Sequence, residues 1–473
     1  MRIRRVRSRT ILLLVLLFAP SWLRRADAYS LLTHEKLIDL TWQSAIVPLL
    51  LSRYPSLTPA ELDQARAYAY GGCVIQDIGY YPFGDRSFSN LTHYVRSGDF
   101  VVNLFRNATN ANELAFAVGA LSHYIGDSNG HPLATNIAVP VEFPSLAHKY
   151  GPVVSYAEGK RQHVQTEFAF DINEIAHHRM APIHYLRHIG LGVSVRQLAL
   201  AYYRTYGLTE DFSQHRRRRF NVGGYRFAVR GFIPRIAYAI TLLHRKVEPA
   251  DPNTPEVVEL RKEVAAVAAQ NNWDFYRRKA GIGTYMLAGF LFILPKIGPL
   301  SLVAVKGPNA KTEAEYVHSV TVSDAALRHM LARFTPPSTK PATGADPPPL
   351  HALPVDRLAG PSERVRASDP CHPLPNRDLD TGQVVKPGGY LLTDSTYADL
   401  LHRLTRQPDR PIPPGIKEDI LAFYSNPNLP ITTKKDAKKW AQVQADLKTL
   451  KNMPTSPEPK PYPTYGDEAD DAQ

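Results

Sequence analysis

Residues 113–127 have the sequence ELAFAVGALSHYIGD, which is typical of a long helix. Its first part, 113–124, is rich in Ala and Leu, which have the highest helix propensity. Residues 195–206 repeat apolar side chains at helical spacing, and residues 255–270 begin with a proline, which favours the first turn of a helix. Strand-like alternation is rare between residues 31 and 334. We therefore expect an all-α fold there.

The same stretch ends in a His and an acid that share one helix face. His123 and Asp127 are four residues apart, so both project from one side of the predicted helix. His123 also follows the apolar segment 115–121, where a buried imidazole and a buried carboxylate both need compensation. A divalent cation compensates both groups at once. The ordinary alternatives are a capping or surface pair, or a core His bonded to a hydroxyl group.

A second His and acid pair has the same spacing. His163 and Glu167 are also four residues apart on a predicted helix, and His131 closely follows the first pair. Zinc favours such mixed imidazole and carboxylate ligands. Upstream, Asp77 and His93 supply one more carboxylate and one more imidazole, although each would be unremarkable alone. Taken together, these residues favour a metal site over unrelated surface pairs.

Composition places the chain among globular proteins. It has 473 residues, 44% of them hydrophobic and 21% charged, with a formal net charge of +12. Two cysteines, Cys73 and Cys371, are too few for a disulfide-rich scaffold and are not spaced as a cysteine zinc site. One long disulfide or two free thiols are both compatible with them.

The N-terminus has the three-part plan of a secretory signal peptide. Five arginines within residues 2–9 precede the apolar run 11–19, and a small-x-small site ends at Ala28. The apolar run is about half a bilayer span, which favours cleavage over a retained membrane anchor. Cleavage would remove seven Arg and one Asp and leave a net charge of +6 on a mature chain that begins at Tyr29. We expect the protein to be secreted or periplasmic.

Proline content divides the rest of the chain. Residues 336–375 hold eleven prolines, too many for a helix or a central strand, so they form a linker or an extended wrap. The tail is Pro-rich, then acidic, and is predicted to be disordered. The expected parts are a signal peptide (1–28), a helical domain (29–335), a Pro-rich linker (336–380), a small helical module (381–452) and a disordered tail (453–473).

The order of the candidate residues resembles the bacterial zinc-dependent phospholipase C family and its relatives, the zinc-dependent single-strand nucleases. The resemblance covers residues 29–179 and consists of an aromatic N-terminus, His, Asp, His, His-x-x-x-Asp, His and His-x-x-x-acid. It implies a first zinc site of Tyr29 and His34, a second of Asp77, His93, His123 and Asp127, and a third of His131, His163 and Glu167. Tyr29 would ligate through its free α-amine and carbonyl, and Asp127 would bridge two metals.

The chain departs from the family pattern in three places. Family members usually begin with Trp instead of Tyr29, and ligation through the backbone tolerates that change. His131 follows Asp127 by four positions instead of the commoner six, and thirty-two residues separate it from His163, an insertion relative to the phospholipase pattern. His148 lies in this insertion and is a rival ligand, but it has no acid four positions later.

The resemblance implies a multi-helix hydrolase with two to three zinc ions that cleaves a phosphodiester. Zinc ions lower the pKa of an attacking water and brace the phosphoryl oxygens. Asp77 would be the catalytic residue, which both ligates zinc and orients or deprotonates the water.

Three functions are compatible with this site. A phospholipase C would act on phospholipid with peripheral membrane contact, although we expect the apolar segment 281–294 to be a buried core helix rather than an interfacial element. A nuclease would use the basic run 215–219 with Phe220, Tyr225 and Phe227 to bind single-stranded nucleic acid. A non-catalytic envelope protein would bind the metal without turnover.

Overall fold

A computed structural model describes residues 31–213, 215–244, 253–293, 307–334 and 374–456. Tyr29, the predicted signal peptide, Cys371 and residues 457–473 lie outside these ranges. Within them the regular structure is helical apart from one two-stranded sheet and two isolated bridges. The predicted all-α class is confirmed.

The helices follow one another along the chain, with η marking short 3-10 or π segments. They are α2 (Leu31–Thr41), η1 (Trp42–Ile46), α3 (Val47–Arg53), α4 (Pro59–Gly72), η2 (Ile75–Tyr80), α5 (Arg86–Tyr94), α6 (Ser97–Asn107), α7 (Ala111–Gly130), η3 (His131–Thr135), α8 (Asn136–Glu142), α9 (Pro144–Tyr150), α10 (Tyr156–Ala176), α11 (Val195–Tyr206), α12 (Arg216–Phe227), η4 (Ala228–Phe232), α13 (Ile233–His244), α14 (Pro255–Gln270), η5 (Trp273–Phe275), α15 (Ile282–Ile293), α16 (Ala310–Phe334), α17 (Leu391–Thr405), α18 (Pro414–Phe423), η9 (Thr432–Lys435) and α19 (Ala437–Asn452). Strand β1 (Tyr185–His188) pairs antiparallel with β2 (Arg277–Lys279).

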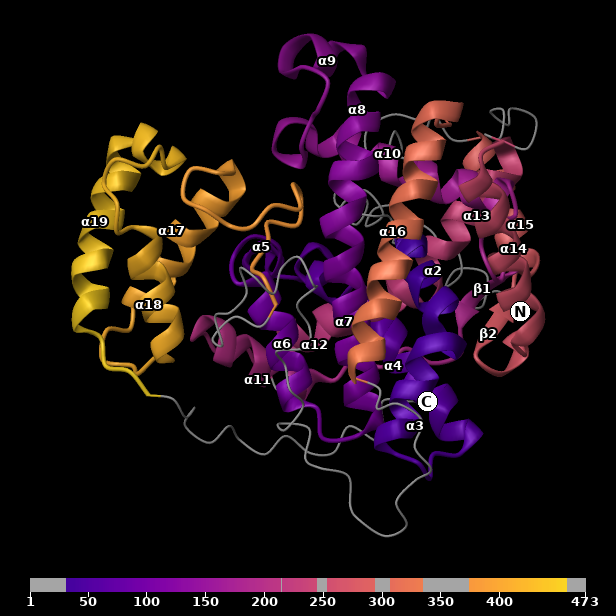
Figure 1. The fold of residues 1–473 in the computed structure, drawn as a ribbon, viewed down its shortest axis with the longest axis horizontal. Coiled ribbons are helices and arrows are strands. Elements are labelled where there is room, and N and C mark those ends of the chain that lie inside the picture. The colour runs from indigo at the N-terminus through magenta and orange to yellow at the C-terminus, as the bar shows by residue number, and fades with distance from the viewer. Residues whose placement is uncertain (1–30, 214, 245–252, 294–306, 335–373, 457–473) are drawn as a thin grey trace, which may run out of the picture.

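Helix α7 lies at the centre of the large domain and packs against α2, α4, α6 and α16 (Figure 1). Its close approach to α4 depends on two glycines. A Cβ at Gly119 would lie 2.2 Å from the carbonyl oxygen of Ala69, and a Cβ at Gly72 would lie 2.1 Å from that of Phe116. Both distances are far below van der Waals contact, so a larger residue at either position would force the helices apart.

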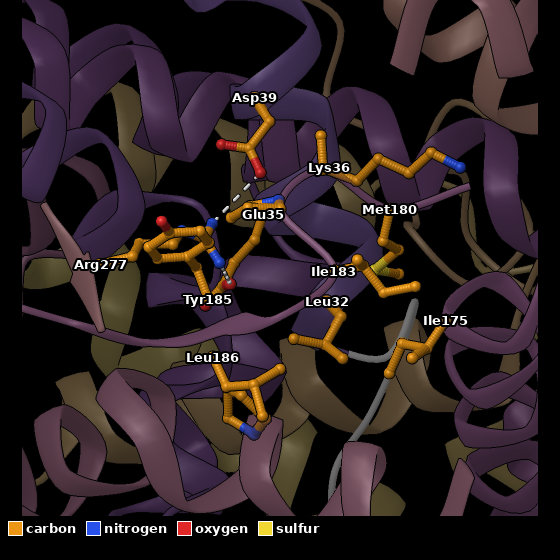
Figure 2. A pocket seen from close by; sticks show the side chains of 13 residues that line it. Leu32, Glu35, Lys36, Asp39, Ile175, Met180, Ile183, Tyr185, Leu186 and Arg277 are labelled. Carbon is orange, nitrogen blue, oxygen red and sulfur yellow. Dashed lines mark hydrogen bonds and ion pairs between the residues drawn. The ribbon is translucent and has the colours of Figure 1, made fainter. Parts of the chain in front are cut away.

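Helix α2 is buried along its whole length and is held by ion pairs. Lys36 Nζ lies 2.6 Å from Glu174 on α10, and Arg277 on β2 lies 3.2 Å from both Glu35 and Asp39. Figure 2 shows the Arg277 guanidinium pointing to the two carboxylates. The cavity beside this network measures only about 20 Å³, room for a single water. The network therefore fixes α2 and is not a ligand site.

Helix α15 contradicts the expectation of a buried core helix for 281–294. Only its narrow stripe of Thr284, Ala288 and Leu291 is buried. The exposed fractions of Ile282 and Phe292 are 79% and 74%. Apolar residues on all sides of the segment leave no periodicity that would show which side is covered, so the sequence indicated burial by composition alone. No helix in the described ranges is both long and apolar enough to cross a membrane.

Helices α17, α18 and α19 form a small module on one side of the large domain (Figure 1). Tyr397 stacks on Phe423 inside the module, with ring centroids 3.8 Å apart. Ion pairs join it to the large domain, from Arg96 to Asp419 at 3.1 Å and from Arg403 to Asp85 at 3.6 Å. The module is thus attached to α5 and to the start of α6.

An extended segment, residues 374–390, leads into this module, and we call it the strap. It begins inside the predicted Pro-rich linker and buries Leu374 and Leu379 completely. The strap runs so close to the start of α6 that a Cβ at Gly98 would lie 2.4 Å from the carbonyl oxygen of Pro375. Tyr124 on α7 donates a hydrogen bond of 2.7 Å to the same oxygen. This part of the predicted linker is therefore a packed wrap.

Candidate metal centre

Eight of the nine predicted ligands come together inside the large domain, carried by six elements. They are His34 on α2, Asp77 on η2, His93 on α5, His123 and Asp127 on α7, His131 at the start of η3, and His163 and Glu167 on α10. All eight are buried. Their nitrogen and oxygen atoms form three groups, each within 4.8 Å: His34, His123 and Asp127; Asp77, His93 and His123; and His131, His163 and Glu167.

Asp127 lies between the first two groups and faces each with a different oxygen. Its Oδ1 is 3.2 Å from His34 Nε2 in the first group, and its Oδ2 is 3.5 Å from His93 Nε2 in the second. The same Oδ2 is 3.0 Å from His123 Nε2, which belongs to both groups. The rings of His34 and His123 stack with centroids 4.3 Å apart. One carboxylate thus faces two adjacent positions, which is the arrangement of a bridging ligand.

The tautomers of His93 and His123 follow from their backbone contacts. His93 Nδ1 donates to the Ser89 carbonyl at 2.7 Å, and His123 Nδ1 donates to the Cys73 carbonyl at 3.0 Å, because a carbonyl can only accept. The remaining Nε2 atoms therefore face each other, 3.4 Å apart. Asp77 Oδ1 lies 3.3 Å from His93 Nε2. Such converging nitrogens and oxygens need a positive charge between them.

The third group has the same character. Glu167 Oε1 lies 2.8 Å from His163 Nε2 and 3.4 Å from His131 Nε2. Both Glu167 oxygens and the Nε2 atoms of both histidines are buried and make no hydrogen bond. Leaving so many buried polar atoms without one is costly unless a cation binds them.

Charge at the site follows from burial and from the neighbouring groups. Burial raises the pKa of Glu167 to about 8 and lowers that of His163 to about 4. Burial also opposes charge on His93, but hydrogen bonds with Asp127 and Asp77 raise its pKa well above the usual value. These shifts favour the protonated forms of Glu167 and His93, whose protons a metal would have to displace, and the neutral form of His163, which can bind a metal directly. Imidazoles and carboxylates at these distances fit zinc.

The residues inserted between His131 and His163 leave the site, and the chain then returns to it. Helices α8 and α9 fill it, and α10 then brings His163 back beside His131, with ring centroids 4.9 Å apart. His148 lies exposed on α9 and belongs to none of the three groups. The geometry favours His163. The ninth predicted ligand, Tyr29, lies outside the described residues.

The strap contributes groups that the sequence did not indicate. His131 Nδ1 donates to the Leu379 carbonyl at 2.9 Å and lies 3.6 Å from Asp380 Oδ1. Tyr94 and Tyr390 donate to the other oxygen of Asp380 at 3.0 and 2.6 Å. Asp380 is 249 positions from His131, in a stretch with no metal-ligand spacing, so no local pattern could have identified it.

The predicted nucleic-acid platform is only partly present. Tyr225 is fully buried and donates to the Gly71 carbonyl at 2.7 Å, so it cannot stack on a base. Arg218 is paired with Glu210 at 2.6 Å and with Asp85 at 3.2 Å. Phe220 is exposed beside this run. Helix α12 packs over η2, where Asn221 donates to the Ile78 carbonyl at 2.9 Å.

Comparison with known proteins identifies the region that carries the site. Residues 33–210 match the family model described as zinc dependent phospholipase C. No curated protein and no solved structure gives a significant match. All eight convergent residues lie inside the matched region, whereas α12 to α16, the strap and the C-terminal module lie outside it.

Proposed function

We propose that this chain, whose residues 33–210 belong to the zinc-dependent phospholipase C family, hydrolyses the phosphodiester of a phospholipid at a site of two to three zinc ions. One observation carries the proposal. His93 and His123 present their Nε2 atoms to each other at 3.4 Å, with Asp77 and Asp127 beside them. A buried group of this kind inside a zinc-dependent hydrolase domain supports metal-assisted hydrolysis.

The eight convergent residues divide among three ions. His34 and Asp127 would hold one, together with the α-amine and carbonyl of Tyr29. Asp77, His93, His123 and Asp127 would hold the second, and His131, His163 and Glu167 the third. Bound zinc supplies Lewis-acid stabilisation of phosphoryl oxygens and lowers the pKa of an attacking water. The backbone carbonyls of Ser89, Cys73 and Leu379 hold three imidazoles in the metal-binding tautomer.

Asp77 is the residue that we assign to proton transfer. Its side chain is 6% exposed, whereas those of His34, His123 and Asp127 are fully buried. A carboxylate at the accessible side of the site can orient the attacking water and accept its proton.

Replacing Asp77 tests this assignment. Asp77→Asn retains an oxygen ligand but is a far weaker base, so we expect zinc to stay bound while hydrolysis of a chromogenic phosphodiester falls about 100-fold or more. Elemental analysis and steady-state kinetics on the same preparation give both values. The exposed Asp409→Asn is the matched control. Undiminished turnover by the Asp77 variant would remove Asp77 from the mechanism.

The substrate is tested by a panel of phosphatidylcholine, single-stranded DNA and a generic phosphodiester, all with zinc-loaded protein. We expect lipid to be preferred, because burial of Tyr225 removes part of the platform that a nuclease would use. A preference for DNA would indicate a single-strand nuclease like those of the related family. Tight zinc binding without hydrolysis of any substrate would indicate a non-catalytic envelope protein.

We also propose export through a cleaved signal peptide, residues 1–28. Helix α2 places His34 one turn after Leu31. An α-amine at Tyr29, two residues before Leu31, could therefore bind the same metal as His34. N-terminal sequencing of the exported protein is expected to begin at Tyr29. A retained N-terminus would remove the α-amine from the first site.

A further inference from the structure

Helix α15 exposes an apolar surface that no described element covers. Besides Ile282 and Phe292, Met286 is 70% exposed and Ile293 is 80% exposed. A side chain beginning at Gly283 or Gly289 would meet no atom within 4 Å. A helix on a water-facing surface normally places polar residues on its outer side. Here the outer side is as apolar as the inner one.

The inner side of α15 packs against the large domain and so holds the helix in place. This packing gives no reason for the apolar residues on the outer side. Thr284, Ala288 and Leu291 recur at helical spacing and pack toward α13. Residues 280–294 contain no charged side chain. Single exposed apolar residues are ordinary, but a continuous surface of them marks an interaction site.

Basic side chains lie next to this surface. Strand β2 ends at Lys279, three residues before α15, and the exposed Arg278 lies opposite the exposed Arg187 in the sheet. Like charges in facing positions are destabilising unless an anion neutralises them. Arg187 also reinforces the effect of burial in lowering the pKa of Arg230. Positive charge therefore accumulates here, with Asp274 as an acidic neighbour of Lys279.

The apolar helix and the basic sheet occupy one side of the molecule, away from the C-terminal module (Figure 1). An apolar helix face flanked by arginine and lysine is the pattern of a segment that lies in the interface of an anionic bilayer. Tyr285, 54% exposed, is of the type enriched at that depth. With twelve residues the helix is too short to span the bilayer.

We propose that α15, together with Arg187, Arg278 and Lys279, docks this protein on the surface of an anionic lipid bilayer. The helix lies flat, with Ile282, Met286 and Phe292 among the acyl chains and the basic side chains on the headgroups. This surface lies outside the residues that match the phospholipase family. Docking would add an anionic bilayer as a partner to the proposed function and rests on it, but vesicle binding can be measured without hydrolysis.

Vesicle sedimentation tests the docking directly. Protein lacking residues 1–28, so that no second apolar segment interferes, is mixed with vesicles of phosphatidylcholine containing phosphatidylglycerol, and with pure phosphatidylcholine. We expect binding to the anionic vesicles that weakens with salt. Met286→Glu with Phe292→Glu should reduce it about 100-fold or more, because two large apolar side chains no longer enter the acyl-chain region. Arg278→Gln with Lys279→Gln should reduce binding to anionic vesicles alone, about fivefold for each charge.

Leu391→Glu is the matched control, because Leu391 is 52% exposed on α17 in the C-terminal module. This variant should bind as the unaltered protein does. Circular dichroism and zinc content confirm that each variant is folded. Each is also assayed on a short-chain phosphatidylcholine dissolved as monomers, where the α15 variants should retain full activity and lose it only on vesicles.

The outcomes separate the two proposals. Unaltered protein that does not sediment with anionic vesicles overturns the docking, whatever its hydrolytic activity. Normal vesicle binding by Met286→Glu with Phe292→Glu, or by Arg278→Gln with Lys279→Gln, also overturns it. A dimer in solution that Met286→Glu with Phe292→Glu converts to monomer, without vesicle binding, would assign the surface to a second copy of the chain. Binding that depends on α15, in a protein that hydrolyses no phospholipid, leaves the docking intact and refutes the proposed function.

Discussion

Three of the five imidazoles of the candidate metal centre are oriented by a backbone carbonyl on the side away from the site. In His93, His123 and His131 a backbone carbonyl accepts the hydrogen of Nδ1, which leaves Nε2 for the site. The Ser89 carbonyl belongs to α5, the helix of His93 itself, and the Cys73 carbonyl lies at the C-terminal end of α4, but that of Leu379 belongs to the strap. The third group therefore depends on residues outside the matched family region.

Asp380 offers a test of this dependence. Its Oδ1 lies 3.6 Å from His131 Nδ1, so its negative charge should make that imidazole a better ligand. Asp380→Asn removes the charge with little change of shape, and we expect one zinc ion to bind about 10- to 100-fold more weakly. Competition with a chromogenic chelator measures each ion. Weakening of all ions alike would indicate a general loss of structure, and Asp409→Asn should have no effect.

At the scale of elements, ion pairs and close helix contacts place the ligand-bearing segments. Helix α2 carries His34 and is tied through Glu35 and Asp39 to Arg277, more than 230 positions away. Burying this network requires every charge to be paired. The position of His34 therefore depends on β2 as well as on α2.

Replacing Arg277 should loosen α2. Arg277→Met leaves Glu35 with His188 and Asp39 with Arg66 but removes the shared cation, and we expect a loss of about 3 kcal/mol in the free energy of unfolding. Urea denaturation measures it. The exposed neighbour on the same strand, Arg278→Met, should change stability by no more than about 0.5 kcal/mol. Equal effects of the two variants would contradict a stabilising role for the buried network.

The strap should loosen as pH rises. Burial, with Asp380 nearby, raises the pKa of Asp378 to about 7, above its value of about 4 in an unfolded chain. Its protonated form is thus favoured on folding, and the stability it contributes is full below about pH 4 and is lost as pH rises through about 7. Amide hydrogen exchange in the strap, corrected for intrinsic rates, should accelerate from pH 6 to pH 8. Asp378→Asn should remove this acceleration, whereas an unchanged pH dependence in that variant would exclude Asp378 as its source.

Local patterns predicted several helices but not which of their sides are buried. Helices α11 and α14 have the predicted bounds, because helical periodicity and an N-terminal proline are local signals. Elements distant in sequence determine which side of α15 is covered. Because its residues are apolar on every side, the sequence of α15 did not show which side that would be. The four-residue spacing of His123 with Asp127 and of His163 with Glu167 indicated the site for the same local reason. Asp380 is joined to the site only by the fold.

In the molecule as a whole, the parts beyond the family match add a contact to the metal centre and an exposed apolar surface elsewhere. The strap contacts the third group on one side, and α15 presents an apolar surface on another side of the large domain (Figure 1). A metal centre buried among helices, with a membrane-facing helix, would allow hydrolysis of a lipid that remains in its bilayer. Zinc bound by the eight convergent residues would perform this hydrolysis.

Removal and restoration of the metal tests whether zinc is required for hydrolysis. Protein purified with zinc is analysed for metal and assayed for phosphocholine release from phosphatidylcholine, before chelation, after chelation and after zinc is returned. We expect two to three zinc ions per chain, loss of phosphocholine release when the metal is removed, and recovery when zinc is returned. Hydrolysis that persists after all zinc has been removed, or zinc-loaded protein that releases no phosphocholine, would contradict it.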